Sequence, residues 1–390
     1  MPASALMQTY ARLPVTFGHG EGVYLYDTAG RRYLDGIAGL GVNNLGHAHP
    51  AVTATLCEQA GKLVHTSNLY HIESQEALAR RLTQVAGMEN CFFGNSGAEA
   101  NEAAIKVARL FGHRRNIRKP AIVVLEDAFH GRTLATLSAT GNRRIQAGFE
   151  PLVAGFIRAP RNDIEALRQI AANNPDVVAF LAEPIQGEGG INMLDADYLR
   201  AVRTLCDERQ WLLMLDEVQS GNGRTGDYFC YQGLGVVPDV VTTAKALANG
   251  VPIGACLARG AAASAISEGQ HGSTYGGNPL ACAVALTVIQ TIVGENLPAN
   301  AVAMGELIRE TLLADAKAAA QIREVRGRGL MLGFELTGNC DGLMQRALES
   351  GLLINVTAGN VLRLLPPLII DSAQARELAT GVAALLRDRA

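Results

Sequence analysis

Lys245 is a titratable side chain in an apolar part of the sequence. It follows the β-branched run 240–243, and alanines flank it on both sides. Because Pro238 and the Gly250–Pro252 region bound that run, a short buried strand is predicted, with the lysine just past its end. Lysine is rarely buried without a partner. In a dry pocket, however, its pKa falls, and the free amine can act as a nucleophile or a base.

Asp216 ends a second apolar run, in the segment WLLMLDEVQSGNGRTG (211–226). A carboxylate in such a place is costly unless it meets a cation or a hydrogen-bond donor. Asp216 is therefore a candidate for charge pairing, although it could also cap a loop.

The same segment contains glycines spaced as in the dinucleotide-binding pattern G-x-G-x-x-G, at Gly221, Gly223 and Gly226. That pattern indicates a dinucleotide site only where it opens a helix directly after a strand. Here the residues DEVQS intervene, and the following DYFCYQGLG has neither the length nor the period of a helix. A nicotinamide oxidoreductase is therefore only a remote alternative.

Small residues lead directly into a helical pattern in the segment GNSGAEANEAA (94–104). The first backbone N–H groups of a helix have no partner within the helix, so this start can bind an anion. Ser96 and Glu99 also fit a capping box, which would make the segment an ordinary helix start. Both interpretations stay open on this segment alone.

A fourth segment, DAFHGRTLATL (127–137), places Phe129, His130 and Arg132 after an apolar strand. The arginine fork recognises carboxylates through two hydrogen bonds. The plain alternative is a core aromatic residue beside a surface ion pair.

Together the four segments supply a lysine amine, a buried acid, an anion-binding helix start, an aromatic ring and a carboxylate-binding arginine. An enzyme that uses pyridoxal 5'-phosphate (PLP) needs each of these groups. The lysine forms a Schiff base with the cofactor, and the acid pairs with the pyridinium nitrogen so that the ring can accept electrons. We therefore predict PLP as the cofactor.

The elements that position these groups alternate along the chain between about residues 50 and 280. Helical periodicity marks three stretches, at 51–63, 74–86 and 97–115. Nearly continuous apolar runs mark four strands, at 121–127, 177–184, 211–218 and 239–244. This alternation predicts an α/β fold with a parallel sheet, whose ligands bind at the carboxyl ends of the strands. We expect a large domain of residues 46–280 and a small α+β domain formed by residues 1–45 and 281–390.

Composition limits the partners and the compartment. The chain has 390 residues, of which 48% are hydrophobic, and a net charge of −3 with no block of like charges. Neither nucleic acid nor a membrane is therefore expected as a partner. The seven cysteines are scattered without a CxxC pair, which predicts a reducing cytoplasm and no metal site. No signal peptide and no membrane-spanning run of ~18 apolar residues are predicted.

Nine segments, in order along nearly the whole chain, resemble the class III (fold type I) aminotransferases. They are YLDGIAGLGVNNLGHAHP, HTSNLY, FFGNSGAEANEAAIKVAR, FHGRT, AEPIQGEGG, LDEVQSGNGRTG, TTAKALANGVPIGA, GSTYGGNPLA and LRLLPPLII. The resemblance implies a PLP-dependent transaminase with a mostly parallel, seven-stranded sheet between helices, and a smaller α+β domain. It also implies a homodimer whose two active sites are shared between subunits.

Carried over to the matching positions, the resemblance implies a role for each site residue. Lys245 would hold the cofactor covalently and move the proton, and Asp216 would pair with the ring nitrogen. The other cofactor contacts would be Ser96, Gly97 and Ala98 at the phosphate, Phe129 on the ring, Gln219 at the ring hydroxyl, and Thr274 at the partner's phosphate. The substrate contacts would be Arg132, Ser273, and the pair Glu188 and Arg363, which opens for the second substrate. Glu183 would only support the site.

The resemblance also narrows the substrates. Related ornithine aminotransferases carry, at the position of Leu40, a tyrosine that contacts the free α-amino group, and an apolar residue suits an acylated amine instead. We expect transfer of the δ-amino group of N2-acetyl-L-ornithine to 2-oxoglutarate, giving N-acetylglutamate 5-semialdehyde and glutamate in arginine biosynthesis. The alternative donors are succinylornithine, succinyl-diaminopimelate, ornithine and 4-aminobutyrate. A PLP aminomutase is the alternative from another class.

Overall fold

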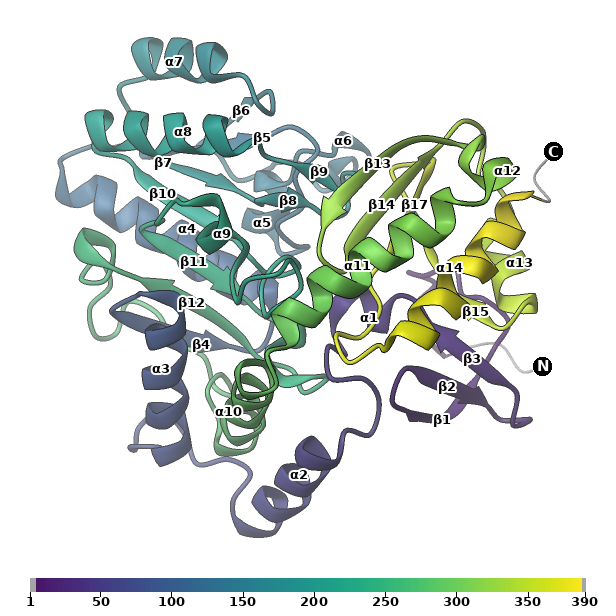
Figure 1. Cartoon of the computed structure of the whole chain (residues 1–390). Coiled ribbons are helices and arrows are strands. Elements are labelled where there is room, and N and C mark those ends of the chain that lie inside the picture. Colours follow the sequence, from purple (N-terminus) through teal and green to yellow (C-terminus); the bar gives the residue numbers. More distant parts are fainter. Residues whose placement is uncertain (1–4, 388–390) are drawn as a thin grey trace.

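The computed structural model describes residues 5–387, and its largest element is a seven-stranded sheet (Figure 1). In spatial order, the strands are β4 (Asn90–Gly94), β12 (Gly254–Ala258), β11 (Val240–Thr243), β10 (Leu212–Asp216), β7 (Val177–Ala182), β5 (Ala121–Leu125) and β6 (Phe156–Ala159). Neighbouring strands are parallel except that β12 runs antiparallel to both β11 and β4. The predicted mostly parallel α/β fold is confirmed.

The central strands β5, β7, β10 and β11 are buried along their whole length. Their continuous apolar runs fit this position, because helices cover both faces of a sheet of this kind. In the pairing of β10 with β11, Asp216 lies opposite Thr242. Since Lys245 comes three residues later, the two predicted catalytic groups lie at neighbouring strand ends.

The helices around this sheet include the three predicted from periodicity. They are α2 (Pro50–Lys62), α3 (Glu73–Ala86) and α4 (Gly97–Arg114). The other helices of this part are α5 (Leu134–Ala139), α6 (Arg143–Gln146), α7 (Ile164–Asn173), α8 (Ala196–Arg209), α9 (Cys230–Leu234) and the short 3-10 helices η1 (Lys245–Ala248) and η2 (Gly260–Ala262). Helix α4 packs against several strands of the sheet, and α8 packs against β10 on the other face (Figure 1). Helix α4 therefore starts at the edge where β10 and β11 end.

Three smaller sheets lie outside the large one, and one of them joins residues from both ends of the described chain. Strands β1 (Phe17–Glu21), β2 (Tyr24–Asp27) and β3 (Arg32–Asp35) are joined by β15 (Leu352–Leu353). A second sheet contains β13 (Ile322–Arg328), β14 (Met331–Leu336), β17 (Val361–Leu364) and β16 (Asn355–Thr357), and a two-stranded ribbon contains β8 (Ile185–Gln186) and β9 (Asn192–Met193).

The helices of the C-terminal part are α10 (Pro279–Gly294), α11 (Leu297–Leu313), α12 (Ala316–Ala319), α13 (Leu343–Glu349) and α14 (Ser372–Arg387), and α1 (Ala38–Gly41) is a short turn near the N-terminus. Helices α11 and α14 pack together, whereas α10 packs against α2 and α3 (Figure 1). Within residues 5–387, no single helix is long and apolar enough to cross a membrane. The helices α10 and α11, which meet at a bend of 64°, reach that length and apolar composition only when they are taken together. The same residues contain no group of three or more His, Cys, Asp or Glu side chains placed to hold a metal ion.

Candidate active site

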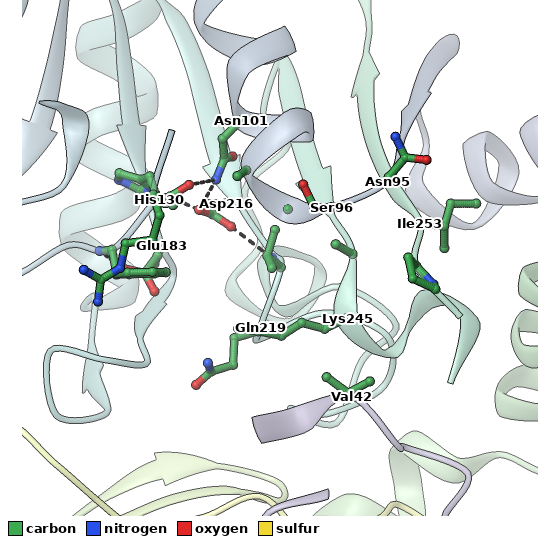
Figure 2. Close-up of a pocket in the computed structure, with 18 of the residues that line it drawn as sticks. Val42, Asn95, Ser96, Asn101, His130, Glu183, Asp216, Gln219, Lys245 and Ile253 are labelled. Carbon is green, nitrogen blue, oxygen red and sulfur yellow. Dashed lines mark hydrogen bonds and ion pairs between the residues drawn. The ribbon is translucent and has the colours of Figure 1, made fainter. Parts of the chain in front are cut away.

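A cavity of about 410 Å³ lies where the parallel strands end (Figure 2). Its size suits a small-molecule ligand. Its lining includes most of the site residues predicted from the sequence, namely Ser96, Gly97, Ala98, Phe129, Arg132, Glu188, Asp216, Gln219 and Lys245. The structure thus brings together residues from five separate stretches of the chain.

Lys245 reaches this cavity because the chain turns sharply after β11. The backbone φ of Lys245 is 46°, in the left-handed region, and the residue opens η1. A non-glycine residue in this region is strained, and such residues gather at functional sites. The side chain is partly accessible from the cavity, but burial of the amine lowers its pKa below the ordinary lysine value, against the opposing influence of Glu188 and Asp216. A lowered pKa favours the neutral, nucleophilic amine.

Asp216 is buried at the end of β10, with 4% of its surface exposed. Its Oδ2 accepts hydrogen bonds from Asn101 Nδ2 at 2.7 Å and from His130 Nδ1 at 2.8 Å, and its Oδ1 accepts one from the Val218 N–H at 3.1 Å (Figure 2). Burial would lower the pKa of His130, but its bond to Asp216 outweighs this and raises the pKa above the ordinary value. Each oxygen of this buried carboxylate therefore accepts at least one hydrogen bond, which offsets the cost of burying a charge.

The start of α4 also lines the cavity, through Ser96, Gly97 and Ala98. Ser96 is the N-cap, and its Oγ accepts a hydrogen bond from the Glu99 N–H at 3.2 Å. Glu99 in turn accepts from the Asn95 N–H at 2.7 Å. The capping interpretation and the anion-binding interpretation therefore hold together, because Gly97 and Ala98 keep first-turn amides that have no acceptor within the helix.

Two arginines are near the cavity: Arg132 lines it, and Arg363 contacts the lining residues Glu188 and Gln219. The exposed Arg132 guanidinium lies 5.5 Å from the centre of the Phe129 ring. Arg363 lies behind the lining and is buried, and its Nη1 pairs with Glu188 Oε1 at 2.6 Å. Burial would raise the pKa of Glu188, but the Arg363 guanidinium outweighs this and holds the pKa below its usual value.

Asn355 and Gln219 complete the surroundings of Arg363. Asn355 Oδ1 accepts from Arg363 Nη2 at 2.8 Å, and Gln219 Oε1 accepts from Nη1 at 3.2 Å. Gln219 thus contacts the buried arginine as well as lining the cavity. Asn355 and Gln219 would therefore still hold the Arg363 guanidinium if its pairing with Glu188 were broken.

Besides Arg363, three other residues singled out from the sequence lie outside the lining, namely Ser273, Thr274 and Leu40. Ser273 is at the rim, where its Oγ accepts from Asn95 Nδ2 at 3.3 Å. Thr274 is exposed on the same loop, away from the cavity of its own chain. Leu40 is 38% exposed, and the residue of that segment that lines the cavity is Val42.

Two further residues line the cavity: Glu183, which the sequence placed only in support of the site, and Asn101, which sequence reasoning missed. Glu183 is buried, accepts the N–H groups of Phe129 at 2.8 Å and Gly187 at 3.1 Å, and has its pKa raised to about 7, chiefly by burial. Asn101 is a polar side chain on the buried face of α4, between Ala100 and Ala104. A polar residue on an otherwise apolar helix face was the signal that could have identified it.

The sequence model of the family described as "Aminotransferase class-III" matches residues 6–386. The chain belongs to the class III aminotransferases. It is 54% identical over 383 residues to the acetylornithine aminotransferase of Nitrosomonas europaea, covering 98% of each chain. It also resembles a solved acetylornithine aminotransferase from Elizabethkingia anophelis, with a TM-score of 0.88, 35% identity, and 97% and 96% of the two chains covered.

An ornithine aminotransferase of Toxoplasma gondii matches this class III aminotransferase in shape, with a TM-score of 0.94, 33% identity, and 98% and 92% of the two chains covered. That structure has partial occupancy of PLP at its active site. The nicotinamide alternative is wrong for this aminotransferase, because residues 218–225 form turns and no helix starts at Gly221.

Proposed function

We propose that this aminotransferase transfers the δ-amino group of N2-acetyl-L-ornithine to 2-oxoglutarate, forming N-acetyl-L-glutamate 5-semialdehyde and L-glutamate in arginine biosynthesis. The observation that carries the proposal is the 54% identity, over nearly the whole of both chains, to an enzyme named acetylornithine aminotransferase. The overall fold does not distinguish N2-acetylornithine from ornithine as the amino donor, because an ornithine aminotransferase at 33% identity matches the chain with a TM-score of 0.94.

The cavity fits PLP, the cofactor on which class III aminotransferases depend. When bound, PLP supplies an electron sink for the carbon that loses its proton. The Lys245 amine would hold the cofactor covalently and carry that proton, and Asp216 would pair with the ring nitrogen. The first-turn amides of Gly97 and Ala98, with Ser96, would bind the phosphate. Phe129 would stack on the ring, and Gln219 would contact its hydroxyl group.

The two arginines divide the recognition of carboxylates. Acetylornithine has one carboxylate, far from its δ-amine, whereas 2-oxoglutarate has two. We infer that Arg132 binds the distal carboxylate of both substrates. Arg363 would bind the α-carboxylate of 2-oxoglutarate after its pairing with Glu188, now at 2.6 Å, opens. Ser273 would contact the substrate from the rim.

A homodimer with shared sites is part of the proposal. Thr274 is exposed, and the segments around it expose Leu63, Val64, Leu69, Tyr70 and Tyr275 by 46–85%. Apolar side chains gathered on a surface mark an interaction site. We infer that a second copy covers this surface and that Thr274 reaches the phosphate bound by its partner. All seven cysteines are free thiols, which suits the proposed cytoplasmic location.

A steady-state comparison of amino donors tests the proposed reaction. With 2-oxoglutarate as acceptor, N2-acetylornithine should give a higher kcat/KM than succinylornithine, succinyl-diaminopimelate, ornithine and 4-aminobutyrate. A higher value for any of the other four would assign the enzyme to that donor. Rearrangement of the donor without 2-oxoglutarate would indicate an aminomutase instead.

Borohydride reduction of the yellow holoenzyme tests the proposed attachment. Peptide mapping should find the reduced cofactor on the peptide that contains Lys245. Lys245→Ala is the matched control and should carry none. Attachment to another lysine would refute the assignment of Lys245.

A further inference from the structure

The surroundings of Asp216 leave one of its acceptor positions unused. A carboxylate has about four lone-pair positions, two on each oxygen. The donors Asn101 Nδ2 and His130 Nδ1, at 2.7 and 2.8 Å, occupy both positions on Oδ2. The Val218 N–H, at 3.1 Å, occupies one position on Oδ1. A donor inside the cavity can therefore bond only to the remaining position on Oδ1.

Asn101 is itself held so that its amide nitrogen faces Asp216. Its two N–H bonds go to Asp216 Oδ2 and to the His130 carbonyl, which is 2.8 Å away. Its Oδ1 accepts from the Thr242 hydroxyl at 2.7 Å. Because the Asp216 carboxylate and the His130 carbonyl can only accept, the amide nitrogen must face them, and the orientation of Asn101 is determined by these two partners. All of these side chains are buried.

His130 is bonded on one side of its ring only. Among the described residues, its Nδ1 bonds to Asp216, whereas its buried Nε2 has no hydrogen-bond partner. Its backbone N–H is fixed by Thr140 Oγ1 at 3.0 Å. Leaving a buried nitrogen unsatisfied is costly and calls for an explanation. The bond from Nδ1 to Asp216 is the interaction that accounts for an imidazole at this place.

We propose that Asn101 and His130 are positioning residues that hold Asp216 so that its Oδ1 faces the ring nitrogen of the cofactor. The inference rests on the proposed binding of PLP in this cavity. Two hydrogen bonds on Oδ2 fix the rotation of the carboxylate, and so fix where Oδ1 points. Without these donors, Asp216 would no longer be held where it can stabilise a proton on the ring nitrogen. That proton is what would let the ring act as an electron sink.

The experiment reads that proton directly. Apoenzyme is loaded with PLP labelled with ¹⁵N in the ring, and the ¹⁵N chemical shift is measured at neutral pH. Wild type should show a protonated ring nitrogen. His130→Phe and Asn101→Leu, which keep the side-chain shape but remove the donor, should move the shift toward that of unprotonated pyridine. Their kcat should fall about tenfold for each unit by which the proton equilibrium moves, with the KM for 2-oxoglutarate nearly unchanged.

His130→Asn is the conservative variant, because its Nδ2 lies as many bonds from Cα as the imidazole Nδ1. It should restore the wild-type shift. Ser220→Ala is the matched control, since it removes a buried 2.6 Å bond to the neighbouring carboxylate of Glu217 without touching Asp216. It should leave the shift unchanged.

An unchanged ¹⁵N shift in both His130→Phe and Asn101→Leu would overturn the inference, whatever their stability. If neither variant folds, Asn101→Ala and His130→Ala replace them. Each removes a donor to Asp216 Oδ2 without placing new apolar atoms beside it, so the shift should move in the same direction, and no movement would again refute the role. Failure of wild-type enzyme to take up labelled PLP would instead overturn the proposed function.

Discussion

Glu217 is a buried acid next to Asp216 that the proposed chemistry does not use. It has no exposed surface, and it accepts hydrogen bonds from the Ser220 hydroxyl at 2.6 Å and from the Tyr231 N–H at 2.9 Å. Burial raises its pKa from 4.5 to about 7, against the opposing effect of these bonds. The folded protein therefore holds this proton more tightly than the unfolded chain does. Glu217 anchors the turn after β10 at a cost that depends on pH.

Glu217→Gln should stabilise the protein at about pH 8 by roughly 3 kcal/mol and have little effect near pH 5. As pH rises from 4.5 to about 7, the unfolded chain ionises while the folded chain does not, so stability is lost over that interval. Glutamine stays neutral and keeps an acceptor for Tyr231. Urea unfolding at the two pH values measures the difference. Equal gains at both would show that charge is not the cause, and Ser220→Ala should be destabilised at both.

Glu188 should act on the choice between substrates rather than on stability. Its side chain is 39% exposed although its partner Arg363 is buried, so the pair is weaker than a fully buried one. Glu188→Ala frees Arg363 for α-carboxylates and should speed the glutamate half-reaction about tenfold relative to the acetylornithine half-reaction, which corresponds to about 1.4 kcal/mol.

Stopped-flow measurement of the two half-reactions checks this prediction. Arg363→Ala should slow the 2-oxoglutarate half far more than the acetylornithine half. Glu188→Gln keeps a hydrogen bond without the charge and should lie between wild type and Glu188→Ala. Equal changes in both halves for every variant would show that the pair does not select substrates.

At the scale of elements, the sequence pattern within a segment predicted the features that depend only on that segment, such as helix bounds and strand ends. The helical period of 51–63, 74–86 and 97–115 predicted α2, α3 and α4 within one residue at each end. Apolar runs predicted where β10 and β11 end, and so placed Asp216 and Lys245 at the edge that binds ligands.

What the sequence could not predict depends on distant contacts. Asn101 and Asp216 are 115 residues apart, and nothing in either segment indicates the other. All residues of strand β12 are small or apolar, and such a run does not indicate whether the strand runs parallel or antiparallel to its neighbours. Its antiparallel pairing with β11 was therefore not predicted. Helix α10 lies at the start of the expected small domain, yet it packs against α2 and α3. Tertiary pairing decides such features, and short patterns do not encode them.

Gly97 shows how closely α4 approaches the turn after β10. A Cβ added at this position would lie 2.7 Å from Val218 Cγ1 and 3.0 Å from Cγ2. Gly97→Ala should therefore destabilise the apoenzyme by about 1–3 kcal/mol, although alanine is otherwise favoured over glycine in helices.

Val218→Ala in the same chain removes both close atoms and leaves the nearest remaining one at 3.5 Å. The double variant should therefore be no less stable than Val218→Ala alone, which gives a favourable coupling of about 1 kcal/mol or more in a double-mutant cycle. Urea unfolding of the four apoproteins measures it. If the losses of stability in Gly97→Ala and Val218→Ala simply add in the double variant, contact with Val218 is not the reason that position 97 is glycine.

At the scale of the whole molecule, buried Arg224 joins the parts that carry the site. It donates to the carbonyls of Leu330 at 3.2 Å and Pro366 at 2.5 Å, and to Asn44 Oδ1. Burial lowers its pKa to about 9, against the opposing influence of Asp35. In the division proposed here, 46–280 against 1–45 with 281–390, Arg224 lies on one side and its acceptors on the other. Glu188 and Arg363 span the same proposed boundary, so in this division the pair would form only where the two domains meet.

The last prediction concerns the second copy of the chain. If Thr274 serves the partner's cofactor, Thr274→Glu places a negative charge beside that phosphate and inactivates the opposite site. Lys245→Ala inactivates the site of its own chain. In a heterodimer of the two variants, the chain with Lys245 receives an unaltered Thr274 from its partner, so one site is intact. Mixing and refolding the two inactive proteins should therefore restore roughly a quarter of the wild-type activity, since random pairing makes half of the dimers mixed.

The matched control puts both substitutions in one chain and mixes that chain with wild type. In its heterodimer, the wild-type Lys245 faces the glutamate that the partner carries in place of Thr274, and the other site lacks its lysine, so neither site works. If Thr274 instead serves its own chain, the results reverse. The two single variants then restore nothing, and the heterodimer in the control keeps one working site. Activity measured against the mixing ratio, with dimer formation followed by analytical ultracentrifugation, separates the two arrangements because only a shared site depends on which chain carries the glutamate.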